Sequence, residues 1–231
     1  MSTHSNRILP LRSDARLAEA ITVNVLNKLS GIDSVLDIGC GDGVVGKHLG
    51  VDRLYSGIDL TESKIYEQNQ SDERIKYCHP HDIQKVTHET PNCDAVLLLD
   101  VLEHTPPFTE LFECALLKSN KYVLVSLPNE LFVLDRARML FGKELPAHSL
   151  DLIGQPGGFK HQYIVNIDKA RRILTTSAIS LGFELEQEWY RPLVSKTKLL
   201  QPILWGLRHC SSNQLWSMGS VFVFSKSSAT R

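Results

Sequence analysis

A run of alternating glycines between an apolar segment and a helical pattern is the strongest chemical signal in this chain. Residues 35–38 are apolar apart from Asp37, and Gly39, Gly41 and Gly43 follow at every second position. Glycine has no Cβ atom, so the backbone of such a loop can adopt positive φ and approach a ligand closely. The pattern therefore predicts a buried strand, a ligand-binding loop and the start of a helix.

Three more acidic residues each follow a predicted strand. Asp59 ends the segment 53–59, Asp82 comes shortly after 74–78, and Asp100 comes directly after the apolar segment 95–99. A carboxylate at the position of Asp59 can accept hydrogen bonds from both hydroxyl groups of a ribose. Asp59 comes 22 residues after Asp37 and follows a second predicted strand, which favours a binding role for it over that of an exposed acid at a strand end.

Together these motifs resemble those of class I S-adenosylmethionine-dependent methyltransferases, over roughly residues 35–183. In that family the glycine loop and the first acid hold the methionine and ribose end of the cofactor. The second acid binds the ribose, and the third binds the adenine amino group. The resemblance implies S-adenosyl-L-methionine as the cofactor. The residues expected to bind it are Asp37, Gly39, Cys40, Gly41, Gly43, Asp59, Leu60, Asp82, Ile83 and Asp100.

Two further segments narrow the resemblance. Residues 99–104, Leu-Asp-Val-Leu-Glu-His, are similar to the fourth-strand motif of ubiquinone-biosynthesis type methyltransferases. Residues 126–163 resemble in part the proteins called methionine-biosynthesis W. The likeness places Asp100 near the transferred methyl group. His161, His104 and Asp100 are the candidates for removing a proton from a hydroxyl acceptor. For both histidines a purely structural hydrogen-bonding role stays open.

We expect a methyltransferase that acts on a small molecule, at oxygen. The Asn-Pro-Pro-Tyr type motif of amino-group methylation is absent from the sequence. Two alternatives stay open. Gly41, Gly43 and Gly46 also fit the dinucleotide pattern of an NAD-linked oxidoreductase, although Asp37 and Gly39 would then interrupt an apolar strand. The chain could instead bind the cofactor as the partner of another enzyme, without transferring a methyl group itself.

No metal site is expected from the sequence. Cys78, His79 and His81 lie close together, but two histidines at i and i+2 with no evident further ligand make a weak metal motif. The five cysteines show no Cys-x-x-Cys pairing, and reduced, mostly buried thiols are the simplest interpretation.

Composition limits the partners. The 231 residues carry a formal net charge of −1, so no overall positive field recruits nucleic acid. No apolar stretch is long enough to span a membrane, and the first residues lack a signal-peptide core. We therefore expect a cytoplasmic enzyme with a small-molecule acceptor. The oligomeric state is left open.

Strand and helix patterns alternate along most of the chain. Strands are expected at 35–39, 53–59, 74–78, 95–99, 122–127, 183–190 and 220–225. Helices are expected at 13–30, 62–69, 83–87, 108–118 and from an N-cap at Asp168. This order predicts an α/β fold: a doubly wound, mostly parallel seven-stranded Rossmann-like sheet, with an antiparallel last strand and helices on both faces.

We expect a single domain over residues 1–231, with a helix in residues 1–31. Segments 130–166 and 193–218 interrupt the alternation as insertions that cap the active site. Both are rich in apolar residues, and Trp205 and Trp216 suit a boundary between apolar and polar surroundings. They form either a cap for an acceptor with an apolar or lipid-linked part, a contact with a membrane surface, or simply part of the core.

Overall fold

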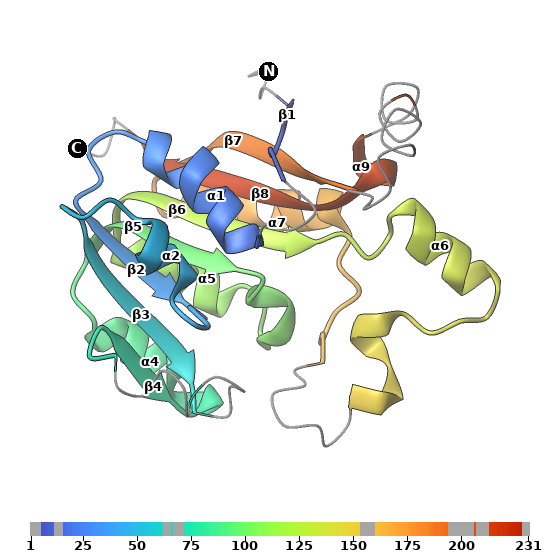
Figure 1. Cartoon of the computed structure of the whole chain (residues 1–231), viewed down its shortest axis with the longest axis horizontal. Helices are drawn as coiled ribbons and strands as arrows, with labels where there is room; N and C mark the ends of the chain where they lie inside the picture. The colour runs from blue at the N-terminus through green and yellow to red at the C-terminus, as the bar shows by residue number, and fades with distance from the viewer. Residues whose placement is uncertain are drawn as a thin grey trace.

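The computed structural model describes residues 6–11, 16–61, 66, 72–152, 160–193, 206 and 213–227. In these residues eight strands form one sheet in the order β1-β7-β8-β6-β5-β2-β3-β4 (Figure 1). The strands are β1 (Asn6–Ile8), β2 (Ser34–Ile38), β3 (Leu54–Leu60), β4 (Ile75–Cys78), β5 (Cys93–Leu99), β6 (Ser119–Pro128), β7 (Phe183–Pro192) and β8 (Ser217–Lys226).

The sheet is mixed, and β8 alone runs against its neighbours. It pairs antiparallel with both β6 and β7, whereas β2, β3, β4, β5 and β6 pair parallel to one another. The seven predicted strands and the antiparallel last strand are confirmed. The additional strand β1 pairs parallel with β7 at the sheet edge. Its three residues are too few to show an alternating pattern, so the sequence did not predict it. The strand forms because β7 supplies its hydrogen bonds.

Helices cover both faces of the sheet, as predicted. They are α1 (Leu17–Asn24), α2 (Val44–His48), α4 (Ile83–Glu89), α5 (Glu110–Lys118), α6 (Val133–Leu140), α7 (Ile167–Ser180) and α9 (Asn213–Trp216). Short 3-10 turns lie at η1 (Leu26–Lys28), η2 (Pro80–Asp82), η3 (Leu102–His104), η4 (Pro146–His148) and η5 (Leu150–Leu152). Successive residues of the central strands bury their side chains in two clusters, with α4, α5 and α7 in one and α1 and α2 in the other.

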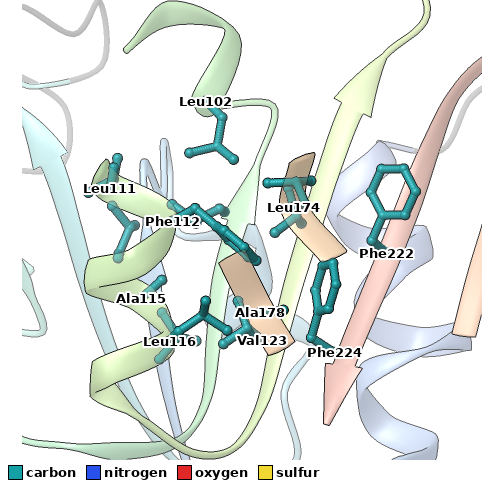
Figure 2. Close-up of a cluster of buried hydrophobic side chains, with 14 of the residues drawn as sticks. Leu102, Leu111, Phe112, Ala115, Leu116, Val123, Leu174, Ala178, Phe222 and Phe224 are labelled. Carbon is teal, nitrogen blue, oxygen red and sulfur yellow. The ribbon is translucent and has the colours of Figure 1, made fainter. Parts of the chain in front are cut away.

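Aromatic and aliphatic side chains fill the first cluster (Figure 2). Phe112 of α5 lies 5.2 Å, centroid to centroid, from Phe224 of β8, and Leu174 of α7 lies in the same cluster. All three side chains are fully buried. Because the strands are covered on both faces, they read as almost continuous apolar runs in the sequence.

The structure corrects two helix boundaries. The helix expected over 13–30 is shorter within the described residues: α1 ends at Asn24 and a 3-10 turn follows. Asn166 caps α7 by accepting a hydrogen bond from the backbone N–H of Lys169, so the prediction of Asp168 as N-cap is wrong. An asparagine caps as well as an aspartate, and Asp168 instead occupies the first turn.

The two insertions are described unequally. The first contains α6, η4 and η5, which extend away from the sheet (Figure 1). Most of 193–212, including Trp205, lies outside the described residues, as does most of the helix expected at 62–69. Among the described helices, none is long and apolar enough to cross a membrane.

Substituting Phe112→Ala should lower the free energy of unfolding by about 3–5 kcal/mol, because the cavity would open in a fully packed cluster. Phe141→Ala removes the same atoms from a side chain that is 76% exposed, and should change it by less than about 0.5 kcal/mol. Chemical denaturation followed by circular dichroism measures both. Equal losses in the two variants would contradict this description of the core.

Candidate functional site

The glycine loop after β2 adopts the predicted conformation. Gly39, Gly41 and Gly43 have φ of 74°, 55° and 67°. A Cβ atom on Gly39 would lie 2.4 Å from Cγ2 of Val101, which follows β5. Glycine is therefore required here both for the left-handed backbone and for the close approach of the segment after β5.

Asp37 lies buried beneath this loop. Its side chain is 1% exposed, and its Oδ2 accepts a hydrogen bond of 3.0 Å from the hydroxyl of Tyr55 on β3. Burial raises the pKa of Asp37 to about 7, although the Tyr55 hydrogen bond opposes the shift. In this structure the carboxyl group joins β2 to β3 directly below the loop.

Asp59 brings the end of β3 to the same loop. Its carboxylate accepts a hydrogen bond of 2.7 Å from the backbone N–H of Leu60. Burial raises the pKa of Asp59, and hydrogen bonds from the backbone of Leu60 and Gly41 oppose that rise. A carboxylate has more acceptor positions than these N–H groups occupy, so the group can still accept from a ligand hydroxyl.

The next predicted acid lies at the end of β4. Asp82 closes the 3-10 turn η2, its side chain is 41% exposed, and Ile83 beside it is buried. The rings of His79 and His81 stack with their centroids 5.7 Å apart. Asp82 therefore offers an accessible carboxylate along the sheet edge that carries the glycine loop and Asp59.

Asp100 is held in a strained backbone conformation by hydrogen bonds from β6 and β7. Its φ is 55°, which is unusual for a residue other than glycine. Its Oδ1 accepts a hydrogen bond of 2.6 Å from Ser126 on β6. Arg191 of β7 donates to both carboxylate oxygens, at 2.8 and 3.0 Å. Gly219 of β8 leaves room for this arginine, since a Cβ atom there would lie 2.8 Å from its Cδ.

The predicted histidines meet in one cluster beside Asp100. The ring centroids of His104 and His161 lie 4.6 Å apart, and the rings meet edge to face. Burial, followed by the charge of His161, lowers the pKa of His104. Glu103 is 1% exposed; burial, followed by the negative charge of Asp100, raises its pKa well above the ordinary value.

Glu130 organises the far side of this cluster. Its Oε1 lies 2.8 Å from Nδ1 of His161 and 2.9 Å from Nε2 of His148. Its Oε2 accepts from the backbone N–H of Val165 at 2.9 Å. Burial would raise the pKa of Glu130, but these hydrogen bonds outweigh burial and lower it.

The structure brings Asp59 to the glycine loop, and joins Asp100, His104 and His161 in a second cluster. Among the described residues the Asp82 side chain contacts His81 and neither of these groups. Sequence reasoning missed Tyr55, Glu130 and Arg191. Arg191 and Asp100 are 91 positions apart, and no local pattern links them. Glu130 could have been noticed as a carboxylate directly after the Pro-Asn pair at 128–129.

A protein-family model described as a methyltransferase domain matches residues 7–167. In structure the chain is similar to a SAM-dependent methyltransferase from Archaeoglobus fulgidus, with 16% identity and a TM-score of 0.58, over 91% of this chain and 93% of that one. No curated protein matches the chain in sequence.

Two further structures share the fold. Magnesium protoporphyrin IX methyltransferase from Synechocystis PCC 6803, with bound SAH, is 13% identical with a TM-score of 0.50, over 91% of this chain and 82% of that one. A putative RNA methyltransferase from Pyrococcus horikoshii is 12% identical with a TM-score of 0.50, over 98% and 94%. These named acceptors are chemically unlike one another, so the shared fold does not select an acceptor.

The buried Asp37 should make stability depend on pH. The pKa of this carboxyl group is higher in the folded protein than in the unfolded chain, so the folded state holds the proton over a wider pH range. The stability that this provides is complete below the pKa of the unfolded chain and is lost as the pH rises to the pKa of the folded protein. Between pH 3.8 and about 7 the wild type should lose on the order of 3 kcal/mol relative to Asp37→Asn, which keeps an acceptor for Tyr55. Denaturation at several pH values measures the difference.

The matched control is Asp52→Asn, on an exposed turn. Its stability should follow the wild type across the same pH range. If the Asp37→Asn curve also runs parallel to the wild type, the buried carboxyl group does not titrate as described.

Proposed function

This chain belongs to the methyltransferase family whose domain model spans residues 7–167, and we propose that it transfers a methyl group from S-adenosyl-L-methionine to a hydroxyl oxygen of a small molecule. One observation carries the proposal: the glycine loop and Asp59 meet at one sheet edge, and a cluster of Glu103, His104 and His161 lies beyond the end of β5, the strand beside β2. Family membership excludes the oxidoreductase alternative for the glycine loop.

The cofactor fits the first part of this edge. In this proposal Asp59 accepts hydrogen bonds from the ribose hydroxyls, and Asp82 accepts from the adenine amino group; the exposed carboxylate of Asp82 and the free acceptor positions of Asp59 support these roles. The positive-φ backbone at Gly39, Gly41 and Gly43 leaves space for the methionine end. When bound, S-adenosyl-L-methionine supplies a sulfonium methyl group that is already electrophilic. The protein's task is then to align the acceptor and exclude water, and alignment can contribute about 7–11 kcal/mol.

The acceptor hydroxyl belongs beside Glu103, His104 and His161. These three groups lie near Asp100 and can promote loss of the proton from the acceptor hydroxyl. Asp100 itself is paired with Arg191 and Ser126, so its carboxylate serves mainly to hold the segment after β5 in place.

An apolar cavity supports an acceptor with an apolar part. It has a volume of about 280 Å³ and lies between the starts of α5 and α7. Phe108, Tyr163, Val165 and Ile173 are among its lining residues. Val165 also donates to Glu130 through its backbone, so the cavity wall is joined directly to the histidine cluster.

The function is tested by incubating the purified chain with methyl-labelled cofactor and cell extract separated into metabolite, lipid and RNA fractions. Mass spectrometry of the labelled fraction should find an O-methylated small molecule or lipid. Label confined to RNA would contradict the proposal. Cofactor binding without any labelled product, together with a stable protein partner, would favour the role of a cofactor-binding partner.

Substituting Asp59→Ala should weaken binding of S-adenosyl-L-methionine by about 1.5–3 kcal/mol, roughly 10- to 150-fold, because a charged acceptor for the ribose is lost. Isothermal titration calorimetry measures the affinity. Asp72→Ala removes a carboxylate that pairs with Arg74 on the turn before β4, and should leave the affinity unchanged. Unaltered affinity in folded Asp59→Ala would rule out the ribose assignment.

The first insertion exposes apolar side chains among basic ones, and we propose that it contacts an anionic membrane surface. Leu140 is 82% and Phe141 76% exposed at the end of α6, close to Arg138 and Lys143 in sequence. Burial against the core therefore does not account for this part of the insertion. The combination of apolar and cationic side chains suits the boundary of an anionic bilayer.

Wild-type protein should co-sediment with vesicles of phosphatidylcholine and phosphatidylserine, and the double variant Leu140→Ser, Phe141→Ser should bind at least tenfold more weakly. Leu117→Ser, which changes a 57% exposed leucine on α5, is the matched control and should bind like the wild type. Equal sedimentation of all three proteins would contradict the membrane contact.

A further inference from the structure

Glu103 is a buried carboxyl group, and one of its two oxygens has no hydrogen-bond partner among the described residues. Its side chain is 1% exposed, and this oxygen is Oε2. Buried polar atoms are nearly always paired, so an unpaired carboxylate oxygen indicates a missing ligand.

Two imidazoles face this carboxylate. One ligand atom from each of Glu103, His104 and His161 lies within 4.8 Å of the others. Backbone contacts hold the two segments together: the N–H of Gln162 donates to the carbonyl of Glu103 at 2.8 Å. Two donor atoms on one Zn²⁺ are at most about 4.2 Å apart, so small side-chain adjustments would close the set.

Glu130 prepares His161 for a ligand role. Its Oε1 lies 2.8 Å from Nδ1 of His161, which places the ring proton on Nδ1 and leaves Nε2 as the lone-pair nitrogen. A carboxylate behind a histidine is the arrangement that orients histidine ligands in metal sites. Arg191, whose positive charge acts on Glu103, is paired with Asp100, and this pairing reduces its repulsion of a cation there.

A second set, Glu130, His148 and His161, is also close enough to share an ion. Both histidines in this set already contact Oε1 of Glu130, and its Oε2 accepts from Val165. This carboxylate is therefore satisfied, whereas that of Glu103 is not. The comparison favours the first set as the ligands and assigns Glu130 to the supporting shell.

We propose that Glu103, His104 and His161 bind one divalent first-row transition ion, of the class of Zn²⁺, Mn²⁺ or Co²⁺. One carboxylate and two imidazoles suit such ions better than Mg²⁺ or Ca²⁺, which prefer oxygen ligands. Three protein ligands leave coordination positions open to a substrate, as in catalytic metal sites.

The role of the ion rests on the proposed function. Bound to the ion, the acceptor hydroxyl becomes more acidic and releases its proton to solvent. The resulting oxygen anion forms the new O–CH₃ bond while the S–CH₃ bond breaks, and the bonding pair stays on sulfur to give a neutral thioether. His161 then acts as a ligand of the ion rather than as the base.

The test uses the full chain after chelation, titrated with Co²⁺ and followed by visible absorption, with Mn²⁺ binding followed by electron paramagnetic resonance. The wild type should bind about one ion per chain. Glu103→Gln and His104→Ala should each weaken binding more than tenfold, and Glu130→Gln about 10- to 100-fold. His148→Gln and the exposed His81→Ala are controls that should change it less than threefold.

Failure to bind either ion by the folded wild type would overturn the site, as would binding unaffected by Glu103→Gln. Loss in His148→Gln with retention in Glu103→Gln would overturn it in favour of the second set. If a methyl acceptor is found and the metal-free chain transfers to it at full rate, the ion's role falls while the proposed function stands. If ions bind as expected but no acceptor is ever labelled, the proposed function falls and the site stands.

Discussion

Parallel strands end at one edge of a sheet, and the arrangement of this molecule depends on that constraint. The carboxyl ends of β2, β3, β4, β5 and β6 all lie at the same edge of the sheet, because these strands pair parallel to one another (Figure 1). Residues far apart in sequence, such as Gly39, Asp59 and Asp100, are brought to that side by backbone geometry alone. The side chains then need only fine positioning, which the hydrogen bonds at each strand end provide.

Charge burial is the second constraint at this edge. A buried ion is costly unless it is paired, and most buried charges here are paired closely. Glu130 has two histidines, and Glu188 of β7 receives two hydrogen bonds of 2.7 Å from the guanidinium of Arg171. The half-buried Asp100 is paired with Arg191 in the same way. Against this background the unpaired Oε2 of Glu103 is an exception, and it lies at the place where chemistry is proposed.

The sequence predicted the glycine loop and the strand ends beside it far better than the contacts around Glu130 and Asp100. Asp37, Asp59 and the glycines lie next to the strands that position them, so local patterns of strand, glycine and acid suffice. Their conformations, including positive φ at three glycines, match the expectation. The sequence did not predict β1, because this short edge strand forms only by pairing with β7. It did not predict the Asn166 cap, because asparagine and aspartate cap helices about equally well.

The acceptor side depends on contacts between segments that are remote in sequence. Glu130 meets His161 across 31 positions, and Asp100 meets Arg191 across 91. Such pairs become visible only when the chain is folded, since neither partner carries a local signature. β8 lies antiparallel between β6 and β7, so the side chain of Arg191 must pass over β8 to reach Asp100. Gly219 of β8 has no side chain and leaves room for it. The same topology that identifies the fold therefore also builds the part of the site in which this chain can differ from other proteins of that fold.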